Sequence, residues 1–305
     1  MAARSSRDRR VVTLLPAATE IVAALGGTDH LLGVSHECDY PPAVRGLPRL
    51  TTTPVDPAAP AAVIDAEVRR LHAEGRPVIA VDGEALRRLA PDLIVTQGLC
   101  EVCAVADGEV HRLARLFDPA PEIISLSATT LAGIALDIRR LGEALDLAAD
   151  AEELVLGLEN RLKRLARSPL AGGPRRVVCV EWLDPLYLAG HWTPELIAAA
   201  GGWDVGACPG AHSARRDWRD VAALQPDIVL IALCGFGVER AEHELRTVAD
   251  PEVLSALTGP EIWLLDGNAY TSRPGPRVVD GAARIRLALE GREAAGLRRW
   301  RRPAV

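Results

Sequence analysis

The segment "LRRLAPDLIVTQGLC" (Leu86–Cys100) decides the fold class, because it joins a helical pattern to a buried strand. Its run "DLIVTQ" lacks regular polar alternation, as expected for a strand that is covered on both faces of a parallel sheet. Pro91 precedes this run and ends the helix, since a proline disfavours helical backbone at the residue before it. The segment therefore predicts one helix–strand step of a parallel α/β sheet.

Two parts of the first half recur in the second half. The stretch "VAALQPDIVLIALC" (Val221–Cys234) again joins a helical pattern, Pro-Asp, an apolar run and a cysteine. The opening "RRVVTLLPAATEIVAALGG" (Arg9–Gly27) is echoed by "RRVVCVEWLDPLYLAGHWTPELIAAAGG" (Arg175–Gly202). Strands that alternate with helical patterns favour βαβ units, so we predict an α/β protein of two parallel-sheet lobes with a cleft between them. The predicted strands lie near Val11–Leu15, Leu32–Ser35, Val78–Ala80, Leu93–Thr96, Glu122–Leu126, Arg176–Glu181, Ile228–Ile231 and Glu261–Leu265.

A long rigid helix is predicted to bridge the lobes. The segment "DAEELVLGLENRLKRLARS" (Asp150–Ser168) begins with a residue type that caps helices and then repeats leucine at helical spacing. We predict an N-terminal lobe over residues 1–126, inter-lobe helices over 127–168 and a C-terminal lobe over 169–305. The basic tail from Glu290 is expected to fray.

Composition excludes some classes of protein. The chain has 305 residues and a net charge of −6, which disfavours a general nucleic-acid binder. No apolar run reaches the roughly 20 residues of a spanning helix, so we expect no membrane insertion. The basic start and the apolar stretch after it mimic an export signal, but Glu20 interrupts the stretch and no clear cleavage site fits. We expect a cytoplasmic protein with reduced cysteines; the periplasm or the cell surface is the alternative if the N-terminus is an export signal.

The expected site is a cleft lined by the segments that follow the strands. In parallel α/β sheets, ligands bind outside the carboxyl ends of the strands. The segments after the predicted strands are enriched in aromatic residues and cysteines, which packing alone does not readily explain. The predicted ligand-binding residues are His36, Tyr40, Trp182, Tyr187, His191, Trp192, Arg215, Tyr270 and Arg273.

The cysteines allow three interpretations. Cys100 and Cys103 form a Cys-x-x-Cys pair, from which one turn can supply two thiolates to zinc or to an iron–sulfur cluster. Cys38 follows a neighbouring strand and could be a third ligand. Cys234 or Cys208 of the second lobe could be the fourth, with His36 as a further candidate, and the predicted set is Cys38, Cys100, Cys103 and Cys234. The same residues also fit small half-buried side chains without a metal, or a dithiol redox switch.

Several of these segments carry a family resemblance. The opening "LLPAATEIVAALGG", the paired "PDLIV" and "PDIVL", the inter-lobe helix and the closing "RPGPRVVDG" resemble the iron-siderophore and cobalamin class of ABC-transporter binding proteins, over about Arg10–Glu290. The motifs "SHECDYP", "LCEVCAV" and "LCGFG" are similar to a branch of this class labelled cobalamin-binding proteins. The resemblance implies two lobes, one bridging helix, a bulky chelate or corrinoid in the cleft, a monomer, and an ABC permease as partner if the chain is exported. The cysteine set departs from ordinary members of the class.

The first functional hypothesis is therefore non-covalent binding of a metal chelate, a corrinoid above all, by a carrier, sensor or transport-associated protein that is not an enzyme. Aromatic side chains would cover the flat face of such a ligand, with His36 and His191 as candidate axial ligands. Cobalamin would then be a ligand, whereas zinc or an iron–sulfur cluster would be a cofactor at the cysteines. The alternative hypothesis is a metal- or Fe–S-binding enzyme or redox protein that uses the cysteine cluster on a binding-protein scaffold.

Overall fold

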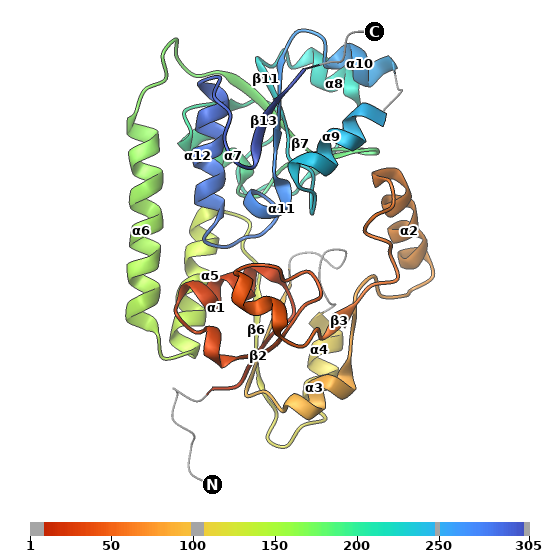
Figure 1. The fold of residues 1–305 in the computed structure, drawn as a ribbon, viewed down its shortest axis with the longest axis vertical. Helices are drawn as coiled ribbons and strands as arrows, with labels where there is room; N and C mark the ends of the chain where they lie inside the picture. Colours follow the sequence, from red (N-terminus) through yellow and green to blue (C-terminus); the bar gives the residue numbers. More distant parts are fainter. Residues whose placement is uncertain (1–8, 99–106, 248–250, 302–305) are drawn as a thin grey trace. The chain divides into compact units, whose positions relative to one another are not determined.

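The computed structural model describes residues 9–98, 107–247 and 251–301 (Figure 1). The chain forms two compact units. Unit 1 contains the residues up to Ala59, together with Ala66–Ala128 and Ala132–Leu156. Unit 2 contains Pro60–Asp65, Thr129–Leu131 and the chain from Gly157 onward. Each unit has its own β-sheet, so the predicted α/β class is confirmed.

The sheet of unit 1 has four parallel strands in the order β2-β1-β5-β6. These are β1 (Val11–Thr13), β2 (Leu31–Val34), β5 (Leu93–Gln97) and β6 (Glu122–Leu126). The central strands are buried on both faces, which explains why their sequences lack alternation. The helices of this unit include α1 (Pro16–Ala24), α3 (Gly83–Leu89), α4 (Asp107–Ala114) and α5 (Leu131–Ala144).

The strand predicted at Val78–Ala80 is not a member of this sheet. The extended residues there are β4 (Ala80–Val81), which pairs antiparallel with β3 (Thr51–Thr52). The side chain of Asp82 accepts hydrogen bonds from the backbone N–H groups of Glu84 and Ala85 and so caps α3. This cap turns the chain into a helix directly after Val81, which leaves too few extended residues for a parallel strand.

The seven-stranded sheet of unit 2 has a parallel centre and antiparallel edges. β7 (Arg176–Leu183), β11 (Ile228–Ile231) and β12 (Glu261–Leu265) run parallel, as predicted. β8 (Leu186–Leu188) returns antiparallel beside β7, and β10 (Ala214–Arg215) pairs antiparallel with β8. The prediction of a frayed tail is wrong, because β13 (Leu297–Trp300) pairs with β12 and buries Leu297 and Trp300. A short strand β9 (Trp203–Asp204) pairs with the start of β7.

Helices cover both faces of the unit 2 sheet (Figure 1). One face of the sheet shares a single core cluster with residues of α8 (Trp218–Ala223), α9 (Val238–Thr247) and α10 (Pro251–Ala256). Helices α7 (Thr193–Ala199) and α12 (Val278–Leu289) pack against each other on the opposite side of the sheet (Figure 1). Trp263 is fully buried within this sheet.

The long helix predicted at Asp150–Ser168 is α6 (Ala148–Arg167). The chain passes from unit 1 to unit 2 inside this helix, between Leu156 and Gly157. The segment after α6 is fixed by the buried Arg286 of α12, whose guanidinium donates to the carbonyl groups of Ser168 and Pro169. A second helix, α2 (Ala61–Ala73), also contains residues of both units. In the described part of the chain, no helix is long and apolar enough to cross a membrane.

Asp204 of β9 is a buried carboxylate with incomplete hydrogen bonding. Its Oδ1 accepts hydrogen bonds from the N–H groups of Gly206 (2.8 Å) and Ala207 (3.0 Å). Its Oδ2 is buried and has no hydrogen-bond partner within the described residues. Burial raises the pKa of Asp204 from its ordinary 3.8 to about 6, against the lowering effect of the two N–H groups.

The raised pKa of Asp204 predicts a pH dependence of stability. The folded protein holds the proton of Asp204 more tightly than the unfolded chain does. Protonation of Asp204 therefore stabilises the fold fully below pH ~4, and this stabilisation is lost as the pH rises through ~6. The difference from 3.8 to about 6 corresponds to about 3 kcal/mol. Asp204→Asn keeps an oxygen acceptor without the charge. In urea unfolding, the free energy of unfolding of the variant minus that of the wild type should therefore rise by up to about 3 kcal/mol between pH 4 and pH 7.

The control is Glu153→Gln, at an exposed position. The difference between its free energy of unfolding and that of the wild type should not rise between pH 4 and pH 7 as it does for Asp204→Asn. Parallel stability curves for wild type and Asp204→Asn across that pH interval would contradict the assignment.

Candidate functional site

Three of the predicted site residues form a row across the edge of the unit 2 sheet. Trp182 of β7 pairs with Tyr187 of β8, and Tyr187 pairs with Arg215 of β10. Directly paired residues on neighbouring strands project from the same face of a sheet, so these three side chains leave the sheet on one face. We call Trp182, Tyr187 and Arg215 the aromatic row.

The turn between β7 and β8 fixes the first member of the aromatic row. The Trp182 indole N–H donates to the carbonyl oxygen of Asp184 at 3.1 Å. One side of the ring packs against Phe236, with 5.4 Å between ring centroids. Trp182 and Tyr187 are both half-buried, and Arg215 is exposed, so each retains surface that a ligand can contact.

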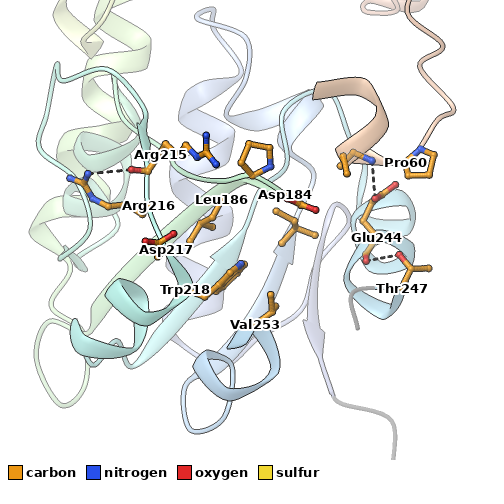
Figure 2. Close-up of a pocket in the computed structure, with 14 residues that line it drawn as sticks. Pro60, Asp184, Leu186, Arg215, Arg216, Asp217, Trp218, Glu244, Thr247 and Val253 are labelled. Atoms are coloured by element: carbon orange, nitrogen blue, oxygen red, sulfur yellow. Dashed lines mark hydrogen bonds between the residues drawn. The ribbon is translucent and has the colours of Figure 1, made fainter. Parts of the chain in front are cut away.

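A cavity of about 450 Å³ lies in unit 2 beside the end of the aromatic row. Figure 2 shows Arg215 and Arg216 on one side of this cavity and Glu244 on the other. Its apolar wall includes Leu186, Trp218 and Val253. The volume lies within the range of small-molecule sites, and Arg215 belongs to both the cavity and the aromatic row.

Glu244 closes one side of the cavity. This buried carboxylate accepts hydrogen bonds from the Arg240 Nε (2.9 Å) and from the backbone N–H of Ala61 (3.1 Å). The second bond caps the start of α2, where an anion is favourable. Pro60 and Ala61, far from Glu244 in the sequence, therefore line the same cavity (Figure 2).

His191 lies in a tightly joined pair of loops in unit 2. Its backbone N–H donates to the carbonyl of Ala211 at 2.6 Å, and its carbonyl accepts from the N–H of Gly210 at 2.9 Å. Its Nε2 lies 3.3 Å from Nδ1 of His212. Burial and, to a smaller extent, the neighbouring His212 lower the pKa of His191 below 6.5, so the imidazole is neutral at neutral pH.

Trp192, Tyr270 and Arg273 are engaged within unit 2. The Trp192 side chain is 5% exposed, and its indole N–H donates to the carbonyl of Thr271 at 2.9 Å. Arg273 is also buried and donates to the side-chain oxygen of Asn268 at 2.8 Å. The Arg284 guanidinium lies 3.8 Å from the ring centroid of Tyr270. Trp192, a predicted ligand-binding residue, is thus packed inside unit 2.

The predicted residues of unit 1 follow β2. Nδ1 of the half-buried His36 lies 2.7 Å from the Thr51 hydroxyl. The Cys38 side chain is 1% exposed, and its Sγ lies 3.0 Å from the Thr19 hydroxyl. Tyr40 is 43% exposed.

Sequence reasoning missed a set of hydroxyl groups at the carboxyl edge of the unit 1 sheet. Thr13, Thr96 and Ser125 lie near the ends of β1, β5 and β6. Thr13 hydrogen-bonds to Thr19 at 2.6 Å, and Thr96 is the register partner of Ser125. The hydroxyls of Thr96 and Ser125 are buried without a partner in the described part of the chain. The signal was present in the sequence as a polar residue near the end of three apolar strands.

The cysteine cluster remains a prediction. Cys100 and Cys103 lie outside the described residues. Cys38 belongs to unit 1, whereas Cys234 is a half-buried residue of unit 2 that follows β11. Among residues 9–98, 107–247 and 251–301, no three His, Cys, Asp or Glu side chains gather as a metal-binding group.

Comparisons with known proteins place the fold in a class. No family model matches the chain. Its fold is that of the binding proteins for cobalamin and iron chelates, which confirms the resemblance seen in the sequence. The periplasmic haem-binding protein RhuT of Roseiflexus has a TM-score of 0.64 and 20% identity, over 93% of this chain and 98% of that protein.

Two similarities point to proteins named for vitamin B12. The chain is 24% identical to a vitamin B12-binding protein of Vibrio cholerae over 281 residues, which cover 90% of this chain and 87% of the relative. The crystal structure of the periplasmic vitamin B12-binding protein BtuF of Vibrio cholerae has a TM-score of 0.64 and 21% identity, over 93% of this chain and 97% of BtuF.

The burial of the thiols predicts their order of reactivity. Cys208 is exposed, whereas Cys38 is buried, and Cys179 is buried in β7 with a pKa that burial raises well above its ordinary value. Only the thiolate reacts with alkylating reagents, and it must be accessible. Iodoacetamide labelling of the folded protein, followed by peptide mass spectrometry, should modify Cys208 at least tenfold faster than Cys38 or Cys179.

Labelling in denaturant is the control, and it should make the three rates similar. If Cys38 in the folded protein is labelled as fast as Cys208, its side chain is not buried. Its thiol would then be accessible as a metal ligand.

Proposed function

We propose that the protein binds a bulky planar metal chelate without changing it covalently, and that the chelate is a corrinoid. The observation that carries this proposal is the aromatic row, Trp182, Tyr187 and Arg215, at the end of β7 in the fold of this class of binding proteins. The names of the relatives, which refer to vitamin B12 and to haem, support the same ligand chemistry.

The chemistry of the aromatic row suits a flat macrocycle. A corrin or a porphyrin presents a broad apolar face and a polar rim. Half-buried aromatic rings cover an apolar face at low cost in conformational entropy, and Trp182 is already held by Asp184 and Phe236. The guanidinium of Arg215 can pair with carboxylate or amide oxygens of the rim. Arg215 should matter more for a porphyrin with free carboxylates than for a corrinoid whose rim carries amides.

The biological role that we propose is that of a carrier or sensor in the cytoplasm. Cys38, Cys179, Cys208 and Cys234 are not in disulfides, which suits a reducing compartment. Delivery to an ABC permease from the periplasm or the cell surface is the alternative, and fractionation of cells that express the full chain separates the two.

The cysteine cluster defines the competing function, a metal- or Fe–S-dependent enzyme or redox protein. Such a protein purified without oxygen would carry stoichiometric iron or zinc, or a visible absorption band, that Cys100→Ser and Cys103→Ser remove. Cobalamin binding that survives these two substitutions favours the binding function.

Removal of one ring from the aromatic row should weaken chelate binding. In titrations with cyanocobalamin and with haemin, Trp182→Ala should lower the affinity for the preferred chelate about tenfold, because a ring contact contributes about 1 kcal/mol in addition to the buried area. Arg215→Gln should lower haemin affinity more than cobalamin affinity.

Trp203→Ala is the matched control, because Trp203 is a 60% exposed tryptophan on β9 of the same unit. Its affinity should equal that of the wild type. Binding that Trp182→Ala leaves unchanged would contradict the placement of the site. Failure of the wild type to bind either chelate would contradict the function itself.

A further inference from the structure

A second feature of unit 2 is independent of the aromatic row. Two short loops, 190–192 and 208–213, are joined side by side by backbone hydrogen bonds, and each contributes one imidazole to a pair. The pair consists of His191 and His212, and we call it the histidine pair. The rings are perpendicular, with an interplanar angle of 90° and 5.3 Å between centroids.

We infer that the histidine pair is a binding site for a divalent first-row transition-metal ion such as Zn²⁺. Nε2 of His191 and Nδ1 of His212 are 3.3 Å apart. Two nitrogens that bind one tetrahedral zinc ion at 2.0–2.1 Å are about 3.3–3.4 Å apart. The pair therefore has the spacing of two ligands before any ion is bound, and water would complete the coordination.

The second ring nitrogen of His191 has the partner that a metal ligand needs. Nδ1 of His191 lies 3.4 Å from the Ser213 hydroxyl oxygen, which also accepts the N–H of Gly190 at 3.2 Å. When Nδ1 carries the proton and donates it to Ser213, the lone pair of Nε2 is directed toward His212. A hydrogen bond of this kind from the other ring nitrogen fixes the tautomer of metal-bound histidines.

The backbone of His191 supports a role beyond loop closure. His191 has a positive φ of 52°. The other non-glycine residues with positive φ, among those described, are Ala90, Asp146 and Gln225, and each lies within two residues of a helix C-terminus. Left-handed backbone is common at helix ends, whereas His191 precedes helix α7. Strained backbone of this kind is concentrated at functional sites.

The loops also bring the two rings together before an ion binds. A Cβ on Gly190 would lie 2.4 Å from the carbonyl oxygen of Ala211, so the two backbones touch at a position that only glycine permits. His212 is exposed and His191 is half-buried, which leaves the space between the two nitrogens accessible from solvent. A pre-formed pair loses little conformational entropy when it binds an ion.

The test is a calorimetric titration of the full chain with Zn²⁺ alone, in a Cys100→Ser/Cys103→Ser background that removes the Cys-x-x-Cys thiols as competing ligands. We expect one ion per chain, and at least tenfold weaker binding in His191→Gln and in His212→Gln. His243→Gln removes an exposed histidine from α9 as the matched control and should bind like the parent.

A second measurement covers the case in which a variant folds poorly. Saturating Zn²⁺ should raise the Tm of the parent chain, because an ion that binds only the folded state stabilises it. The rise should disappear in His212→Gln, whose exposed ring contributes little packing. Equal Zn²⁺ affinity in the parent and both pair variants, or no binding by the parent, would overturn the inference, and neither result bears on chelate binding.

Discussion

The antiparallel pairing of β8 with β7 is the interaction on which the account of unit 2 depends. β7 leaves the parallel centre of the sheet, turns at Asp184 and Pro185, and returns as β8, so that Trp182 and Tyr187 become direct neighbours. β10 then adds Arg215 to the same row. A parallel sheet without this return would send the chain into a helix after β7, and the three side chains would have no common face. The β7–β8 hairpin and β10 thus bring the two aromatic residues Trp182 and Tyr187 and the cationic Arg215 to one face of the sheet.

Two carboxylates, the buried Glu244 and the half-buried Glu195, bind distant segments of the chain in unit 2. Glu244 accepts the N–H of Ala61 at the start of α2, and Glu195 accepts the N–H of Leu131 at the start of α5 with 2.8 Å between the atoms. Both bonds satisfy a backbone donor at a helix N-terminus, where four such donors lack partners within the helix. A charged acceptor makes each bond stronger than a neutral one, so these two short segments can be held in unit 2 without a sheet pairing of their own.

The sequence predicted the parallel strands well and the edge strands poorly, for a physical reason. Runs such as those of β5, β11 and β12 are buried on both faces, so their apolar residues mark the bounds directly. β8, β10 and β13 have two to four residues, too few for a periodic signal, and β10 and β13 pair with strands that are remote in the sequence. The same limit applies to the site. Residue type pointed to Trp182, Tyr187 and Arg215, but only the strand register joins them. It also suggested Trp192, whose burial against Thr271 could not be seen without the fold.

The central claim is that the face made by Trp182, Tyr187 and Arg215 meets the macrocycle of a metal chelate. The most direct measurement is a crystal structure of the full chain with bound cyanocobalamin. We expect the Trp182 ring to lie in van der Waals contact with the corrin and Arg215 to reach an oxygen of its amide rim. A corrinoid bound only to other surfaces, with the aromatic row open to solvent, would contradict it.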